Sequence, residues 1–80
     1  MSTKWKRHQR IKNNPADVRF EEAEAWLASF GFEEREAKGS HKVFTHPSWD
    51  GRLTMQSHQG KAKAYQIKQA LDAIKEIYNV

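Results

Sequence analysis

The sequence contains no cysteine, so it has neither a disulfide framework nor a thiolate zinc site, and packing alone must stabilise the fold. It also lacks a long apolar run, since no stretch approaches the roughly 18–20 residues that a membrane-spanning helix requires. The N-terminus is basic but has no apolar segment of the kind found in a secretory signal. From these absences we expect a domain that resides in the cytoplasm and does not enter a membrane.

The length and charge of the chain limit its fold and its partners. A single domain of 80 residues buries only about 60% of the surface that its unfolded chain exposes, which leaves room for two helices and a short sheet. The net charge is +4, which favours an anionic partner. This charge is uneven, because residues 4–12 carry five Lys and Arg and no acid, residues 17–36 are mainly acidic, and further basic residues lie within 38–63.

The basic N-terminal segment has only Trp5 and Ile11 as large apolar groups before Asn14-Pro15, a pair that disfavours helix. We therefore expect residues 1–16 to form a flexible or partly helical arm, with His8 as a tail residue, and residues 17–80 to form the compact domain. Two interpretations of the arm stay open. It either holds an RNA backbone or is a solvated tail.

Two segments have the apolar spacing of amphipathic helices. Residues 19–30 place apolar groups at steps of three and four, and Gly31 is suited to end this helix. Residues 64–78 repeat the pattern up to Tyr78. We expect both stripes to form the core, with Leu27 and Leu71 near the middle of each; the other members are Phe20, Ala23, Trp26, Phe30, Ile67 and Ile74.

Three short segments, residues 32–37, 40–46 and 53–57, are expected to be strands, the first of them at an edge. Asp50-Gly51 is expected to turn the chain between the second and third strands. Adjacent Val43 and Phe44 leave open which face of the second strand meets the helices. The element order α-β-β-β-α predicts an α+β fold, with a three-stranded antiparallel sheet and both helices packed on one face.

Four histidines, His8, His41, His46 and His58, are the only strong candidates for acid–base chemistry. In RNA cleavage, a base removes the 2′-hydroxyl proton and an acid protonates the leaving 5′-oxygen, and one tuned histidine contributes about 10²–10⁴-fold. This chemistry requires no metal and no cofactor, and the spacing of the last three histidines fits no usual zinc site. On residue types alone, His41 is either catalytic or an ordinary surface histidine, and His46 is expected to be structural.

Several residues near His41 in the sequence extend this site. Gly39 allows the positive φ of a tight turn just before the second strand. Ser40 is not expected to be a nucleophile, because adjacent strand residues face opposite sides and no Asp completes a triad. Trp49 is expected either to cover the small core or to contact RNA bases. The basic residues that would neutralise phosphates, or would form a solvated charged face, are Lys38, Lys42, Arg52, Lys61 and Lys63.

These motifs together resemble the HicA toxin family. The matching set is Gly31-Phe32, Lys-Gly-Ser-His at 38–41, His46-Pro47, Asp50-Gly51-Arg52 and His58 before a closing helix, within a region from about Phe20 to the C-terminus. Ser48 and Trp49 look inserted relative to the family pattern. The resemblance implies a small RNA-cleaving toxin with a double-stranded-RNA-binding-domain-like fold, whose partners are mRNA and a HicB-like antitoxin.

The resemblance also assigns roles to residues. It implies that His41 is the catalytic residue, and His58 matches a recurrent histidine of the family. Together with the sequence positions given above, the residues expected to support the site or to bind RNA are Lys38, Gly39, Ser40, Lys42, Arg52, His58, Lys61 and Lys63. The alternative function is a non-catalytic RNA-binding module of the same fold. A third is a protein-interaction module, which would show no salt-dependent affinity for RNA.

Overall fold

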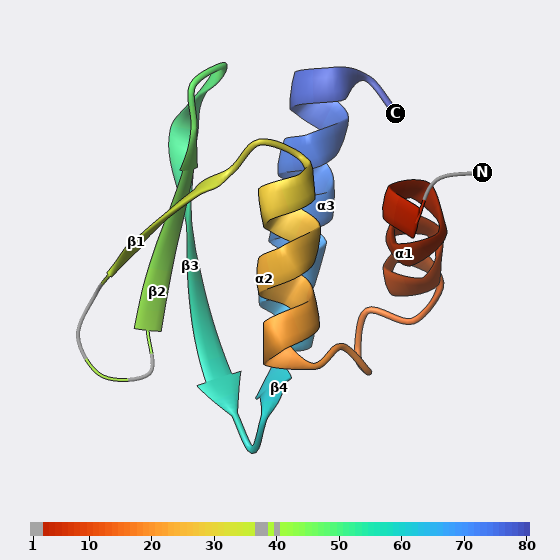
Figure 1. Ribbon diagram of the computed structural model, residues 1–80, viewed down its shortest axis with the longest axis vertical. Helices are drawn as coiled ribbons and strands as arrows, with labels where there is room; N and C mark the ends of the chain where they lie inside the picture. Colours follow the sequence, from red (N-terminus) through yellow and green to blue (C-terminus); the bar gives the residue numbers. More distant parts are fainter. Residues whose placement is uncertain (1–2, 37–38, 40) are drawn as a thin grey trace.

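The computed structural model describes residues 3–36, 39 and 41–80. In chain order its elements are α1 (Thr3–Asn13), α2 (Phe20–Ser29), β1 (Glu33–Glu36), β2 (His41–His46), β3 (Trp49–His58), β4 (Lys61–Ala62) and α3 (Ala64–Tyr78). Three layers are visible in Figure 1: the sheet, then α2 beside α3, then α1 on the side of these helices away from the sheet. The predicted α+β class is confirmed, with helices on one face of an antiparallel sheet.

The sheet contains four strands in the order β1-β2-β3-β4, one more than the sequence predicted. The additional strand is Lys61–Ala62, which lies between the last predicted strand and the last predicted helix. The amide of Ala62 donates a hydrogen bond to the Val18 carbonyl (2.9 Å), and the amide of Phe20 donates one to the Gly60 carbonyl (3.0 Å). These bonds tie the start of α2 to the sheet. A strand of two residues shows no alternation in the sequence, so hydrophobic pattern alone does not reveal it.

The hairpin between β2 and β3 is confirmed, but its turn lies at Pro47-Ser48 and not at Asp50-Gly51. Proline suits the second position of such a turn. The Ser48 amide also donates a hydrogen bond to His46 Nδ1 (3.0 Å), which holds the turn closed. Asp50 and Gly51 consequently belong to β3.

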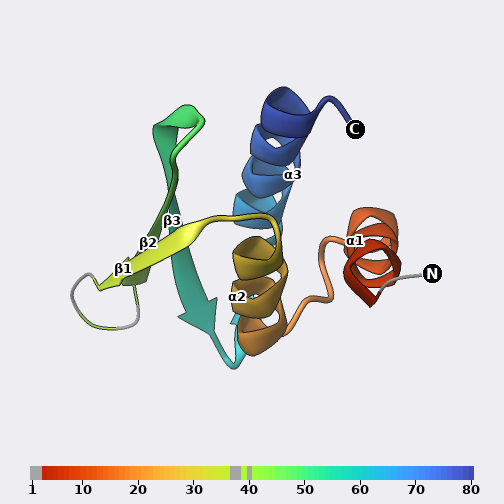
Figure 2. The same ribbon diagram turned by 45° about the horizontal axis from the view of Figure 1, so that its top comes forward.

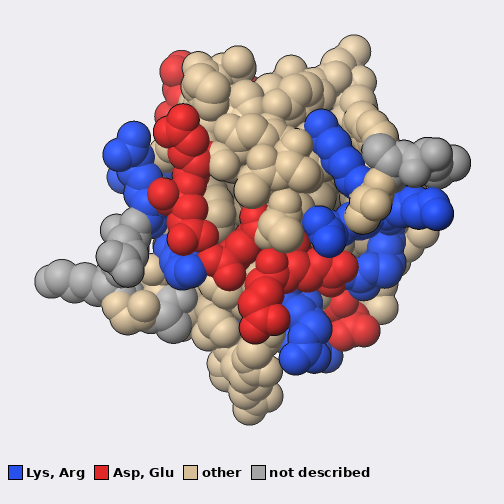
Figure 3. Space-filling view, in the orientation of Figure 1, with Lys and Arg blue, Asp and Glu red and all other residues tan. Residues whose placement is uncertain are grey.

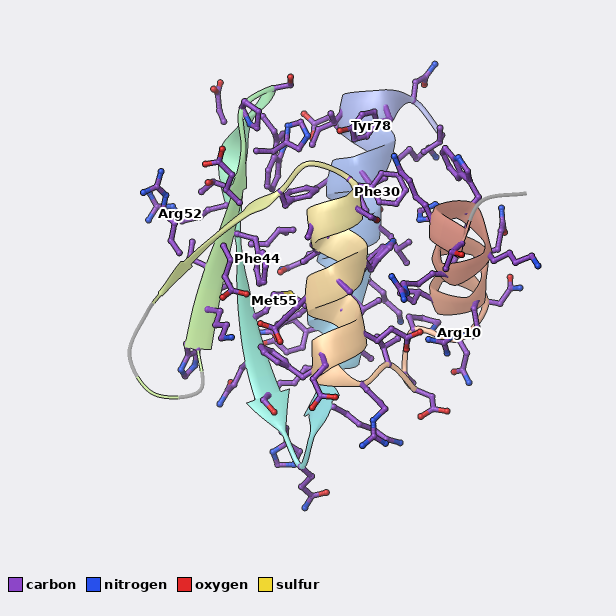
Figure 4. The ribbon with its side chains drawn as sticks, in the orientation of Figure 1. Arg10, Phe30, Phe44, Arg52, Met55 and Tyr78 are labelled. Carbon is purple, nitrogen blue, oxygen red and sulfur yellow. The ribbon has the colours of Figure 1, made fainter. Side chains whose placement is uncertain are left out.

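The pairing register settles which face of β2 meets the helices. Phe44 lies opposite Leu53 and is 1% exposed, whereas His41 at the start of the strand is exposed. Figure 4 shows Phe44 and Met55 between the sheet and the helices, with Arg52 labelled on the other side. The face that carries His41 is therefore not covered by helices, and we call it the open face.

Trp49 is half-buried and packs against the core, so the structure supports its role as a cover. The rings of Trp49 and Phe32 make an edge-to-face contact, with their centroids 6.2 Å apart. At the end of α2, Gly31 adopts φ +89°, the left-handed conformation that ends a helix as predicted.

The N-terminal segment is a packed helix and not a solvated tail. Ile11 is fully buried and His8 is 5% exposed, so the expectation that His8 is a tail residue is wrong. The indole Nε1 of Trp26 donates a hydrogen bond to His8 Nδ1 (3.1 Å), which satisfies both buried polar groups. This bond lets an imidazole lie beside Ile11 on the buried side of α1. The division of the chain at residue 16 stays a prediction.

Two cations of α1 contact the rest of the domain. Lys4 Nζ lies 4.4 Å from the ring centroid of Phe30, in cation–π geometry, and Arg10 forms an ion pair with Glu22. Lys4 and Arg10 thus help to hold α1 against the rest of the domain. In Figure 2, turned from the first view, α1 still lies beyond α2 and α3, away from the sheet.

Burial of His8 makes stability depend on pH. Desolvation, followed by the charge of Lys12, lowers the pKa of His8 below its usual 6.5. The unfolded chain therefore protonates His8 more readily than the folded chain does. The stability that the buried, neutral His8 contributes is complete above about pH 6.5 and is lost as the pH falls through the pKa of His8 in the folded chain. We expect His8→Gln to reduce the loss of stability between about pH 7 and 5.5, measured by urea unfolding. Equal losses in both proteins would contradict this.

The two leucines that the sequence placed mid-stripe are not equivalent. Leu27 is fully buried, whereas Leu71 is half-buried at the margin of the core. We expect Leu27→Ala to lower the free energy of unfolding by about 2–4 kcal/mol, because it leaves a cavity, and Leu71→Ala to lower it less. Thermal and urea melts of the two variants test this order, and a larger effect at Leu71 would be inconsistent with the packing.

Candidate functional site

His41 lies at the start of β2 on the open face, directly after the turn that contains Gly39. Gly39 adopts φ +67°, as the sequence predicted for a tight turn. Across the sheet, His41 is opposite Gln56 of β3. His58 is two residues further along β3, so the register makes it a diagonal neighbour of His41 on the same face of the sheet. Both histidines are exposed.

Basic side chains share the open face. Arg35 of β1 lies opposite Val43, and Arg52 of β3 is exposed at a position of the same parity as Gln56. The guanidinium of Arg35 is 4.0 Å from the Glu33 carboxylate, and an exposed ion pair of this kind contributes little to stability. Both guanidinium groups are therefore accessible to an anionic ligand.

Lys42 points the other way. Its Nζ donates a hydrogen bond to Glu24 Oε2 (2.7 Å) and lies 3.4 Å from Glu34 Oε2, on the helix side of the sheet. The hydrogen bond to Glu24 raises the pKa of Lys42, despite partial desolvation, so the lysine stays charged and its charge is shared by carboxylates. The structure does not bring Lys42 to the face of His41.

The remaining predicted residues are dispersed. Lys61 pairs with His58 across β3 and β4, and its Nζ lies 2.8 Å from Asp17 Oδ1 in an exposed ion pair. Lys63 is the N-terminal cap residue of α3. Lys38 and Ser40 lie outside the described residues.

His46 has the structural role that the sequence predicted. Its Nδ1 accepts the hydrogen bond from Ser48, and its Nε2 lies 3.0 Å from the Phe30 carbonyl oxygen and 2.9 Å from the Tyr78 hydroxyl. The ring is buried, and its contacts join the hairpin turn, the end of α2 and the end of α3. These contacts leave it no place on the open face.

Sequence reasoning missed Gln56 and Arg35 as neighbours of the site. Both follow from the register, which places Gln56 opposite His41 and Arg35 opposite Val43. A turn at Asp50-Gly51 gives a different register, so only a correct turn assignment would have identified these neighbours.

Charge is distributed unevenly over the surface. In Figure 3, acidic side chains cross the front over α2 and β1, while basic side chains lie at the left margin and over the α1 side. An acidic band repels a polyanion. A nucleic acid that approaches the sheet is thus directed away from this front.

The order α2-β1-β2-β3-α3, with one sheet face open and the other covered by helices, is the arrangement of double-stranded-RNA-binding-domain-like proteins. The family model described as "HicA toxin of bacterial toxin-antitoxin" matches residues 20–76, and the chain belongs to this family. Comparison with curated proteins and with solved structures gave no match. Among the described residues, no helix is both long and apolar enough to cross a membrane.

Proposed function

We propose that the chain is a ribonuclease toxin that cleaves mRNA on the open face, with His41 as the residue that transfers protons. The observation that carries this proposal is the position of His41: exposed, on an uncovered sheet face, with His58 as its diagonal neighbour. Membership of a toxin family supports the toxic activity. The proposed partners are mRNA in the cytoplasm and a HicB-like antitoxin.

The two imidazoles suit the two proton transfers of the reaction. A neutral imidazole removes the 2′-hydroxyl proton, and the oxygen attacks the adjacent phosphorus to form a 2′,3′-cyclic phosphate. The bond from phosphorus to the 5′-oxygen breaks, and an imidazolium protonates that oxygen as it leaves. His41 performs one transfer and His58 the other, while Arg52 and Arg35 offset the phosphate charge. No step requires a metal or a cofactor.

Cleavage of a mixed RNA in the presence of a metal chelator tests the proposal. We expect fragments that end in a 2′,3′-cyclic phosphate, because the attacking oxygen belongs to the substrate. RNA that is bound but not cut would instead indicate the non-catalytic RNA-binding module of the same fold.

Binding to RNA is expected to weaken steeply as salt rises. Each cation that neutralises a phosphate releases counterions, so the logarithm of the affinity falls linearly with the logarithm of the salt concentration, by about 0.7 per single-strand contact. Fluorescence anisotropy with a labelled single-stranded RNA, using His41→Ala to prevent cleavage, measures this slope. A flat slope, or no binding, would favour the protein-interaction module.

A further inference from the structure

The outer edge of β3 is largely unpaired within the described part of the chain. β2 pairs with one side of β3, but on the other side β4 reaches only Ser57 and His58. The Gln56 amide points to this outer side, because it donates a hydrogen bond to the Gln66 side-chain oxygen of α3 (2.8 Å). Main-chain groups alternate in direction along a regularly paired antiparallel strand, so those of Thr54 also point outward.

The two edges of the sheet differ in how they are protected. β1, at the opposite edge, has four residues and all of them are charged, a composition that discourages pairing with another chain. β3 has ten residues, and its stretch from Leu53 to Gln56 carries no charge. Of the two edges, that of β3 is the one suited to receive an added strand.

A groove of about 300 Å³ runs between this edge and α3. Buried Leu53 and Ala73 contribute to its lining, and Trp49 stands at one end, where its Nε1 donates a hydrogen bond to Glu76 (3.2 Å). The polar lining residues are Arg52, Gln69, Asp72 and Glu76. Asp72 and Glu76 make the rim acidic, while the side chain of Arg52 points away from the helices (Figure 4), so the groove disfavours RNA and favours a segment with a basic side chain.

We propose that this groove and the outer edge of β3 bind an extended segment of the antitoxin, which adds to the sheet as a strand. The main chain of the segment bonds to Thr54, one apolar side chain sits over Leu53, and a lysine or arginine meets Asp72 and Glu76. The inference rests on the proposed function, because it names the partner of a toxin. Occupation of this edge places the antitoxin beside the open face, where it blocks RNA without covering His41.

Thr54→Pro tests the added strand directly. Proline removes the outward amide of residue 54 and is tolerated on a strand edge, so the inner bonds to β2 remain. In the inactive His41→Ala chain we expect antitoxin affinity, measured by calorimetry, to fall by about tenfold or more, because a main-chain hydrogen bond is lost and the ring obstructs pairing. The matched control, Thr54→Val, keeps the amide and should bind like the parent. Equal affinities of Thr54→Pro and Thr54→Val would overturn the proposal.

A second variant covers the case in which Thr54→Pro does not fold, as judged by circular dichroism. Asp72→Lys reverses a charge on the solvent side of α3 and should weaken antitoxin binding, whereas Glu33→Lys, the same reversal at the opposite edge, should not. Because Asp72→Lys adds positive charge, a gain of RNA affinity with unchanged antitoxin affinity would assign the groove to RNA and overturn the proposal. Cleavage by the wild-type chain is measured separately, so failure of the ribonuclease assignment is distinguishable from failure of this docking site.

Discussion

His41→Ala is expected to lower the rate of RNA cleavage by about 10²–10⁴-fold, the contribution of one well-placed general acid or base. The fold should be unaffected, because the side chain is exposed on a face that no helix covers. RNA affinity should persist, since Arg35 and Arg52 remain on the same face. Cleavage of a mixed RNA by wild type and variant at equal protein concentration measures the effect.

Two further variants identify what the imidazole does. His41→Gln can still form hydrogen bonds but cannot titrate, so its activity should be as low as that of His41→Ala if proton transfer is the role. His58→Ala should also lower the rate if it supplies the second transfer. Cleavage that persists undiminished in His41→Ala would remove His41 from the mechanism and leave the RNA-binding module as the better description.

Trp26→Ala is expected to lower the free energy of unfolding by about 3–5 kcal/mol. The indole is fully buried between the helix layers, and it donates the hydrogen bond to His8. Its removal leaves a large cavity and an imidazole without its donor, a penalty of about 1–3 kcal/mol for a buried polar group. Because the total stability of a small domain is about 5–15 kcal/mol, this variant should be partly unfolded at 37 °C. Urea unfolding at neutral pH measures the loss.

Trp26→Phe separates the hydrogen bond from the cavity. It keeps most of the ring volume but lacks the indole N–H. It should therefore lower the free energy of unfolding, but by less than Trp26→Ala does. Combining it with His8→Gln in a double-mutant cycle gives the coupling between the two side chains. No coupling would show that this hydrogen bond does not contribute to holding α1 against α2.

Helices α2 and α3 could be predicted because their apolar spacing is regular. The predicted helix from Ala64 to Tyr78 has the bounds observed for α3, and the one over 19–30 differs from α2 by a single residue at each end. α1 could not be predicted with the same success, because one member of its buried stripe is His8. Its burial depends on Trp26, which is distant in the sequence.

The strands show where local patterns are insufficient. Asp50-Gly51 is a favourable turn pair, but Trp49 packs against the core, and the side chain of His46 stabilises the alternative turn at Pro47-Ser48. Tertiary contacts thus override local turn preference. The sequence left open whether Val43 or Phe44 faces the helices. His41 could be placed on the open face only once the structure showed that Phe44 is the buried one of the two.

The charged neighbours of the site were the least predictable part. Lys42 follows His41 in the sequence and was assigned to the phosphate, yet it bonds to Glu24 on another element. Alternation alone placed Lys42 and His41 on opposite sides, but only the fold shows that the far side carries carboxylates. Proximity in sequence is therefore a poor guide to shared function within a strand.

The separation of the open face from the core bears on how such a chain evolves. Substitutions at His41 or Arg52 change exposed side chains that no helix covers, so under the proposed mechanism a loss of catalysis would carry little cost in folding. Selection for activity and selection for a folded protein would then act on largely different residues. Under the proposed docking, an inactivated copy that remains folded keeps the β3 edge and would still sequester antitoxin in a cell that also holds active toxin.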